Sequence, residues 1–502
     1  MRLMMMKKEY KNPIINADYS DPDVIRVEDT YYMTASSFNY TPGLPILTSK
    51  DMVNWQLKNY AIKNIDYPMY TKPAHAKGVW APAIRYYNDY FWIFYGMPDE
   101  GIFMIKTKDP LGEWSQPYLL LEGKGYIDPC PFWDGDRAYL IHGYAKSRIG
   151  FKSYLGVFEM SLDATRVLSD DVFLYDGTKT QETIEGPKVY KRGEYYYIFA
   201  PAGGVTYGWQ TVLRSKEIMG PYEEKIVLQQ GSTPVNGPHQ GGWVEAEDGS
   251  HWFIHFQDRG IYGRVVHLQP MQWKDDWPII GNVGQPVLSY PMPVERTDSI
   301  NDLAASDDFC KEELGLQWQW FGNHTKDFYQ LEASRKTLRL NCLNGPNLWE
   351  TPNILTQKFL YDRFDVEIEM DYNRLEIGSQ AGCVVLGGQY TYLAIKKEES
   401  GFKLLHGIST GTGASREEEV VESIDIDQTS GKIHLFLSLD QEKGINQIKM
   451  AYVYQGIQKT ACKTLFTPSD DTWVGSKIGL YAIGNAGSAD FNYIKVVPKD
   501  HD

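Results

Sequence analysis

Three carboxylic acids stand in short, related motifs of this sequence: Asp21 in YSDPDVI, Asp128 in YIDPCPF and Glu185 in TIEGPKV. Taken singly, an aspartate before a proline is ordinary turn chemistry, because proline fixes φ and aspartate hydrogen-bonds its own backbone. Glu185 fits that explanation less well, since glutamate has little turn preference and is followed by a glycine that permits close backbone approach. Together, three carboxyl groups could perform acid–base chemistry, in which one group donates a proton and another accepts a proton from water.

The three motifs belong to a unit that recurs five times along the chain. Each copy has a turn of small or acidic residues, a short strand-forming run, a polar hairpin and an aromatic-rich second strand. The copies are about 50 to 60 residues apart, a spacing at which repeated four-stranded units build a β-propeller. We therefore predict a five-bladed propeller. The copies read SDPDVIRVEDTYYMTAS from Ser20, WAPAIRYYNDYFWIFYG from Trp80, IDPCPFWDGDRAYLIHG from Ile127, IEGPKVYKRGEYYYIFA from Ile184 and GGWVEAEDGSHWFIHFQ from Gly241.

In a propeller the first strand of every blade faces the central axis, so equivalent positions meet around one funnel. The predicted alignment places Asp21, Ala81, Asp128, Glu185 and Gly241 there. Three like charges around a narrow opening raise one another's pKa and are costly to desolvate, so the fold alone gives no reason for them. Hydrolysis of a glycosidic bond would explain the three acids. In that reaction one carboxylic acid must protonate the leaving oxygen, while one carboxylate activates water or attacks the sugar. A third carboxylate can keep the acid protonated and oriented.

The blade signature ends before SYPMPVERTDSINDLAASDDF, a stretch of proline, charge and turn residues that is typical of a linker. Short alternating segments follow it, among them FDVEIEMDY, KIHLFLSLD and KIGLYAIG. Many antiparallel strands separated by turns indicate a jelly-roll-type β-sandwich. We predict an all-β chain with the five-bladed β-propeller over residues 1–300 and the β-sandwich over residues 301–502.

The 502 residues carry a formal net charge of −15, which argues against nucleic acid because a phosphate backbone requires a basic surface. No segment has the apolar length needed to span a membrane, and the N-terminal apolar run is too short for a signal peptide. As written, the sequence predicts a cytoplasmic protein; a signal removed beforehand would make it periplasmic or secreted. The five cysteines are scattered and form no Cys-x-x-Cys pair, so neither a disulfide framework nor a zinc site is expected.

The run NADYSDPDVIRVEDTYYMTASSFNYTPGLPILTSKDMVNW, together with WAPAI, IDPCPF, IEGPKVYK and GPHQGGWVE, resembles glycoside hydrolase family 43 over essentially the whole chain. Members of that family are five-bladed propeller enzymes, and its β-xylosidases and α-L-arabinofuranosidases add a C-terminal β-sandwich. The resemblance implies that Asp21 is the general base, Glu185 the general acid, and Asp128 the residue that tunes the acid's pKa and holds the sugar. It further implies inversion of configuration, with base and acid about 6.5 to 9.5 Å apart, and no required cofactor.

The same resemblance implies four substrate-binding residues. Arg264 in YGRVVHLQP matches an arginine that contacts the sugar, and Trp80 and Phe38 match aromatic walls that offer apolar faces to a sugar ring. For both aromatic residues core packing is the alternative, because aromatic side chains are common in strands. His239 in GPHQGGW is expected near the axis, where such a histidine contacts substrate or, in some members, lies beside a calcium ion. No metal ligand is predicted; a calcium ion in the channel stays open, because its oxygen ligands have no recognisable spacing here.

The resulting prediction is an inverting exo-glycosidase that releases xylose or arabinose from the non-reducing ends of plant cell-wall oligosaccharides. β-1,4-Linked xylose is the first choice and α-L-arabinofuranose the second. The sandwich is expected to pack on the propeller and lend an aromatic residue to the pocket rim, which would restrict the enzyme to chain ends. The sequence does not identify that residue, nor does it decide whether the protein forms a homo-oligomer.

Three alternatives accompany this prediction. One is an endo-acting arabinanase or xylanase of the same family, and another is a non-catalytic carbohydrate-binding protein, since a fold does not determine a function. The third is a retaining fructosidase of glycoside hydrolase family 32, which shares a propeller and a sandwich. It ranks lower, because those enzymes carry an arginine before the middle aspartate, where this chain has Ile127, and a cysteine after the glutamate, where it has Gly186.

Overall fold

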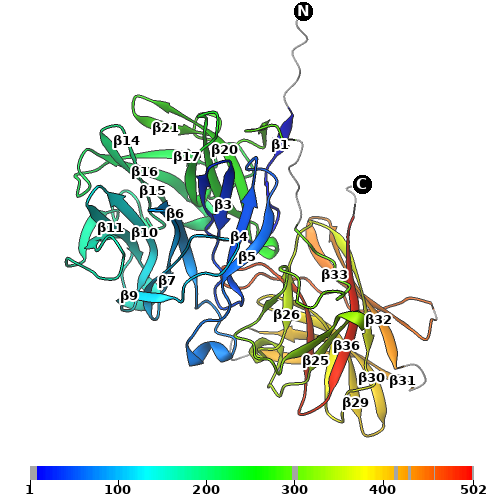
Figure 1. Ribbon diagram of the computed structural model, residues 1–502. Helices are drawn as coiled ribbons and strands as arrows, with labels where there is room; N and C mark the ends of the chain where they lie inside the picture. The colour runs from blue at the N-terminus through cyan, green and yellow to red at the C-terminus, as the bar shows by residue number, and fades with distance from the viewer. Residues whose placement is uncertain (1–7, 297–302, 412–415, 428–430, 457, 500–502) are drawn as a thin grey trace, which may run out of the picture.

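The computed structural model describes residues 8–296, 303–411, 416–427, 431–456 and 458–499. Figure 1 shows two all-β bodies side by side, an N-terminal propeller and a C-terminal sandwich. Both predicted folds are confirmed. The predicted boundary between residues 300 and 301 lies outside the described residues.

The propeller consists of five four-stranded antiparallel sheets, each formed by consecutive strands of the described chain. Tight polar hairpins join first to second strands; in the second blade Asn88 and Asp89 both have positive φ, as such a turn requires. The strands are β2 Asp23–Val27, β3 Thr30–Thr34, β4 Gly43–Ser49 and β5 Gln56–Ile62; β6 Trp80–Tyr87, β7 Tyr90–Met97, β8 Gly101–Thr107 and β9 Tyr118–Glu122; β10 Tyr126–Asp134, β11 Arg137–Tyr144, β12 Tyr154–Met160 and β13 Val172–Asp176; β14 Lys188–Arg192, β15 Tyr195–Ala202, β16 Trp209–Ser215 and β17 Glu223–Gln229; and β18 His239–Glu245, β19 His251–Asp258, β20 Arg264–Lys274 and β21 Trp277–Ile280.

The ring is closed by the segment that precedes the first blade, which lies along strand β20 of the fifth. Ile15 forms a β-bridge with Val266, and the N–H of Tyr19 donates to the carbonyl oxygen of Arg264 over 3.0 Å. Before this segment, strand β1 (Glu9–Lys11) pairs with β22 (Ser289–Pro291). The closure brings the turn at Asp21, which precedes β2, next to the start of β20.

The sandwich consists of two seven-stranded sheets, with alternating side chains of both sheets buried between them. In spatial order the first sheet contains β23 Gln319–Trp320, β26 Leu355–Lys358, β35 Lys477–Ile483, β28 Gln380–Leu386, β29 Tyr390–Glu398, β30 Gly401–Thr410 and β31 Glu417–Ile426. The second contains β24 Tyr329–Glu332, β25 Thr337–Asn341, β36 Ser488–Pro498, β27 Phe364–Asp371, β32 Lys432–Glu442, β33 Ile445–Tyr454 and β34 Thr460–Ala461.

Helices in the described residues are single turns: α1 Lys146–Ile149, α2 Gly204–Tyr207, and the 3₁₀ turns η1 Pro68–Thr71, η2 Gly260–Tyr262, η3 Ala333–Arg335 and η4 Leu348–Glu350. None of these is long and apolar enough to cross a membrane.

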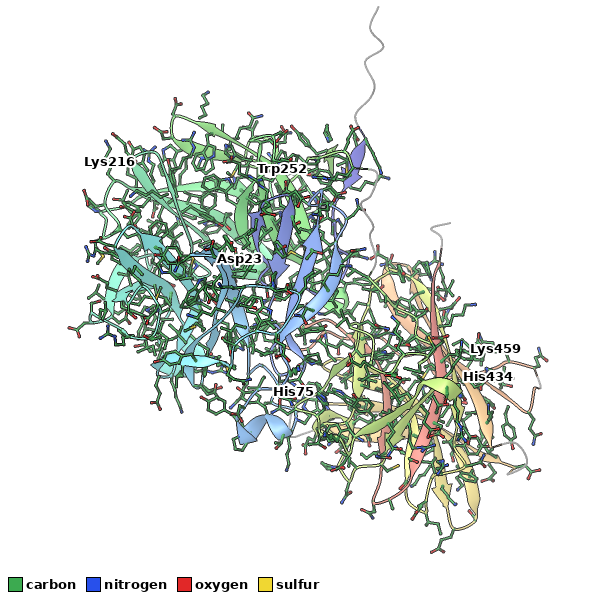
Figure 2. The ribbon with its side chains drawn as sticks, viewed as in Figure 1. Asp23, His75, Lys216, Trp252, His434 and Lys459 are labelled. Atoms are coloured by element: carbon green, nitrogen blue, oxygen red, sulfur yellow. The ribbon has the colours of Figure 1, made fainter. Side chains whose placement is uncertain are left out.

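The two domains share a continuous apolar cluster, in which Phe38 and Trp80 of the propeller meet Phe321 and Tyr481 of the sandwich. A polar contact accompanies it, since His75 Nδ1 of the propeller lies 3.2 Å from Asp471 Oδ2 of the sandwich. The His75 ring stacks on Trp349 with centroids 3.5 Å apart. Figure 2 shows His75 on the propeller side that faces the sandwich, whereas His434 and Lys459 lie on the sandwich's far side. The sandwich is thus docked against the propeller as predicted.

Candidate active site

The backbone makes the same unusual turn where the inner strands begin. Asp21, Ala81 and Asp128 have φ values of 55°, 33° and 57°, and each is followed by a proline. The left-handed region costs a residue with a Cβ on the order of 1–2 kcal/mol, so the surrounding structure must hold these turns in place. β-Bulges occur at the same places in β6, β10 and β18, and bulges are common next to functional sites because they redirect side chains.

In the fourth and fifth blades this left-handed position is occupied by Gly186 and Gln240, with φ values of 56° and 36°. The predicted alignment, which equated Glu185 and Gly241 with Asp21, was therefore one residue off in these blades. Glu185 instead corresponds to the residue before the turn, the position held in the fifth blade by His239. Its side chain consequently leaves the backbone from a different point than the aspartates do.

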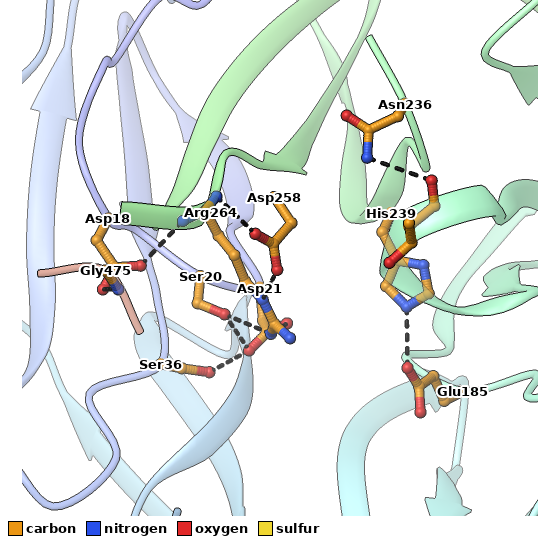
Figure 3. A network of polar contacts seen from close by, with 12 residues as sticks. Asp18, Ser20, Asp21, Ser36, Glu185, Asn236, His239, Asp258, Arg264 and Gly475 are labelled. Carbon is orange, nitrogen blue, oxygen red and sulfur yellow. Dashed lines mark hydrogen bonds and ion pairs between the residues drawn. The ribbon is translucent and has the colours of Figure 1, made fainter. Parts of the chain in front are cut away.

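Asp21 is only 5% exposed, and three neighbours contact its carboxylate. Ser20 and Ser36 donate hydroxyl hydrogen bonds to Oδ2 over 2.8 and 2.5 Å, and Arg264 Nη1 lies 3.3 Å from Oδ1 (Figure 3). Ser36 Oγ in turn accepts the N–H of Ala81 over 2.7 Å, which ties the first blade to the second. These contacts fix the orientation of one carboxylate at the axis.

Glu185 is the more accessible carboxyl group, with 29% of its side chain exposed. His239 Nε2 lies 2.9 Å from Glu185 Oε1, so the two residues that precede the axial turns of blades four and five hold each other (Figure 3). Asp128 is buried and accepts the N–H of Gly186 over 2.8 Å. Burial, and then the charges of Glu185 and Asp21, raise the pKa of Asp128 to about 8. Asp128 therefore interacts with both other acids and retains its own proton near neutral pH.

Arg264 begins β20 and is 7% exposed. Its Nη1 donates to Ser20 Oγ over 2.8 Å, its Nε lies 3.9 Å from Asp258 Oδ2, and its backbone N–H donates to Asp18 Oδ1 over 3.1 Å. Asp18 Oδ2 accepts the N–H of Gly475 in the sandwich over 3.1 Å. A sandwich loop is therefore connected to the Asp21 side of the site through two residues (Figure 3).

That loop also supplies an aromatic ring. Trp473 meets Trp80 edge-on with centroids 4.5 Å apart, and stacks on Phe38 with centroids 6.2 Å apart. On the propeller side the Arg148 guanidinium lies over the Trp80 ring, 5.0 Å from its centroid. Phe38 and Trp80 therefore fit both alternatives that the sequence left open. They pack in the domain interface, and they also lie next to the turns at which the inner strands begin.

A calcium ion in the channel was left open by the sequence. Among the described residues at this place, the buried side-chain atoms without a hydrogen-bond partner include His239 Nδ1 and Gln240 Nε2, both nitrogens. Calcium takes six to eight oxygen ligands.

All seven predicted site residues belong to this one connected region. Sequence reasoning missed other members of the region, among them Ser36 and Trp473. Ser36 lies after the second strand in SSF, where nothing separates it from other polar loop residues, and Trp473 reaches the site only through the docking of the domains.

Comparisons with known proteins agree with this geometry. Residues 10–278 match the model of the glycosyl hydrolases family 43, and residues 306–497 match that of the beta-xylosidase C-terminal concanavalin A-like domain. The chain belongs to glycoside hydrolase family 43. The predicted family and enzyme class are confirmed.

Individual relatives of this family 43 enzyme cover nearly its whole length. It is 30% identical to a protein of Formosa agariphila named beta-xylosidase, over 98% of this chain and 90% of the relative. It is 27% identical to a Bacteroides ovatus protein named non-reducing end alpha-L-arabinofuranosidase BoGH43B, over 99% of this chain and 94% of the relative. A crystal structure of a mutant of the GH43 protein BlXynB from Bacillus licheniformis superposes with a TM-score of 0.85 at 25% identity, over 98% and 100% of the two chains.

Proposed function

We propose that this family 43 enzyme is an inverting exo-glycosidase that removes β-1,4-linked xylose from the non-reducing ends of plant cell-wall oligosaccharides. The proposal rests on the observation that Asp21 and Glu185 have different environments. Asp21 is buried and oriented by serine and arginine, while Glu185 is accessible and held by His239. Asp128 retains a proton beside them because burial raises its pKa.

In the proposed reaction, water lies between Asp21 and the anomeric carbon. Asp21 takes a proton from the water as its oxygen attacks that carbon, and Glu185 gives a proton to the glycosidic oxygen as the bond to the leaving sugar breaks. One displacement inverts the configuration, so a β-xyloside gives α-xylose. The proton that Asp21 gains then returns through solvent to Glu185.

The remaining site residues position the two catalytic carboxyl groups and influence their charges. Arg264 keeps Asp21 in place and presents its guanidinium to sugar hydroxyl groups, and His239 fixes the carboxyl group of Glu185. Asp128 lies beside Glu185 and interacts with it electrostatically, because two ionised carboxyl groups would repel each other.

Exo action is supported by the sandwich. Trp473 covers Phe38 and Trp80, and aromatic rings at that place would stack on the terminal sugar while blocking a chain that continues past it. An endo-acting enzyme needs an open groove along which the polymer can pass. Xylose is placed before arabinofuranose because the 30% identical relative is named for xylose release, and the 27% identical one for arabinofuranose release.

The test compares hydrolysis of nitrophenyl β-D-xyloside and nitrophenyl α-L-arabinofuranoside by the wild type and Asp21→Ala, with NMR of the first-formed anomer from xylobiose. We expect α-xylose from xylobiose, and loss of nearly all turnover in Asp21→Ala. Faster release of arabinose than of xylose would change the substrate but keep the mechanism. Retention would exclude Asp21 as the base, and binding without turnover would favour a carbohydrate-binding protein.

A further inference from the structure

Three potential metal ligands converge in the sandwich. A ring nitrogen of His406, a carboxylate oxygen of Glu422 and the thiol of Cys462 all lie within 4.8 Å of one another. They come from strand β30, from strand β31, and from the residue after strand β34. Because β31 is the last strand of one sheet and β34 the last strand of the other, the cluster joins the edges of both sheets.

The local fold holds these groups together. His406 pairs with Glu422 across β30 and β31, directly beside a β-bulge in that pairing. The backbone N–H of Lys463, next to Cys462, donates to Glu422 Oε1. His406 is 1% exposed, Cys462 9%, and the Glu422 side chain 16%, so the cluster is largely shielded from solvent.

His406 directs an unpartnered nitrogen, Nδ1, toward Glu422. Its Nε2 lies 3.1 Å from Thr391 Oγ1, and the Thr391 hydroxyl can donate its single hydrogen to the carbonyl oxygen of Gly407 over 3.1 Å. With the hydrogen placed there, Thr391 accepts from Nε2–H, and Nδ1 carries a free lone pair. Nδ1 has no hydrogen-bond partner and lies 4.0 Å from Glu422 Oε1. Orientation of a histidine through its second nitrogen is typical of metal sites.

A charged imidazole is the competing explanation for Nδ1 facing Glu422. It would require a hydrogen bond from Nδ1–H to the carboxylate of Glu422. The separation of 4.0 Å between Nδ1 and Glu422 Oε1 is too long for that bond. A lone pair on Nδ1 that faces a carboxylate is instead the arrangement expected of two ligands of one cation.

We propose that His406, Glu422 and Cys462 form a binding site for a divalent transition-metal ion, with Zn²⁺ as the best fit. Zinc accepts nitrogen, oxygen and sulfur ligands together and is satisfied by three protein ligands and one water. Bond lengths of about 2.0 to 2.3 Å require neighbouring ligand atoms roughly 3.3 to 3.8 Å apart, so the side chains must move inward by about 1 Å or less. Calcium and magnesium are disfavoured, because they prefer oxygen ligands.

Such an ion would link the two sheets at their edges, far in the chain from the catalytic carboxylates. The expected consequence is a more stable sandwich rather than a change in chemistry. The sequence could not indicate the site, because its ligands are spread over 57 positions without a metal-binding spacing, as the numbering from 406 to 462 shows.

The test uses the full chain, purified without a histidine tag and stripped with a chelator. Co²⁺ is added as a spectroscopic probe, and Zn²⁺ affinity is measured by competition with a chromophoric chelator. We expect one equivalent of Co²⁺ to give a thiolate-to-cobalt charge-transfer band and the strong visible bands of four-coordinate cobalt. Zinc should displace the cobalt and raise the Tm.

Three variants locate the site. Cys462→Ser should abolish the charge-transfer band, and Glu422→Gln, whose side chain is partly exposed, should weaken Zn²⁺ binding about tenfold or more. Cys310→Ser is the matched control, because Cys310 is the exposed free cysteine of the sandwich and should not affect the band. The Tm of each metal-free variant reports whether it folds. Absence of a charge-transfer band in the wild type, or a band lost in Cys310→Ser and kept in Cys462→Ser, would overturn the proposal.

Discussion

Trp473 of the sandwich packs edge-on against Trp80 of the second propeller blade, with ring centroids 4.5 Å apart. The contact places a ring from one domain beside the axial turn of the other, because Trp80 directly precedes Ala81. Aromatic contacts of this kind contribute about 0.5–1.5 kcal/mol beyond the burial of their area. The sandwich is therefore part of the wall next to the catalytic residues.

The first prediction follows from that contact. Trp473→Ala should lower kcat/KM for xylobiose about tenfold, mainly through KM, because a face for the terminal sugar is lost. Cleavage inside longer xylan chains should increase at the same time, since the rim opens. Steady-state kinetics and product sizes from xylan measure both effects. Trp349→Ala is the control, because Trp349 is a sandwich aromatic in the same interface that stacks on His75 instead; equal losses in both variants would indicate a general weakening of docking.

The second prediction concerns Glu185 as the proton donor. Glu185→Gln should lower kcat for xylobiose by about 10²–10⁴, because a poor leaving group needs protonation. Activated aryl xylosides should lose much less, since their leaving groups depart without a proton. A plot of rate against leaving-group pKa is therefore expected to be steep in the variant and shallow in the wild type. Glu182→Gln, in the same loop but 75% exposed, should match the wild type; equal losses on all substrates in Glu185→Gln would contradict the assignment.

The propeller was predictable because its repeat combines local signals: turn residues, hairpins and aromatic second strands recur in order. Asp21 and Asp128 were found for the same reason, since the proline after each marks the turn. Glu185 was found in an alignment one residue off, because the turn residue after it is a glycine and the motif lacks an aspartate. The left-handed φ of Gly186 corrects that register.

Other features depend on distant parts of the chain and could not be read locally. Trp473 is one of many aromatic residues in strands or loops, and only domain docking brings it to Trp80. The contact of Arg264 with Asp21 depends on closure of the ring between the first and last blades. In both cases the contact joins residues that are far apart in the chain, so no local sequence pattern indicates it.

The third prediction concerns Arg264, whose Nη1 contacts both Ser20 and Asp21. Arg264→Lys keeps the charge but loses the planar fork, so Asp21 should be held less well. We expect kcat/KM to fall about 10²-fold on both nitrophenyl glycosides, with a change in kcat as well as KM. Arg259→Lys is the matched control, since Arg259 pairs with Asp362 at the domain interface. An effect confined to KM would mean that Arg264 binds sugar without positioning Asp21.

The fourth prediction concerns the pH dependence of stability. Burial and two neighbouring charges raise the pKa of Asp128 from 3.8 to about 8, so the folded protein keeps a proton that the unfolded chain loses above pH 4. Because the folded state binds more protons in this window, Asp128 makes stability fall as the pH rises from about 4 to 8. Asp128→Asn removes the ionisation while its carbonyl oxygen can still accept the N–H of Gly186.

The wild type and Asp128→Asn should therefore have similar Tm values near pH 4, and the variant should be more stable at pH 8, by on the order of 10 °C. Its activity should nevertheless fall, because the carboxyl group that interacts with Glu185 is lost. Differential scanning calorimetry across this pH range measures the effect, with Asp136→Asn in the exposed hairpin of the same blade as the control. Parallel Tm curves for the wild type and Asp128→Asn would mean that Asp128 ionises in the folded protein as it does in the unfolded chain.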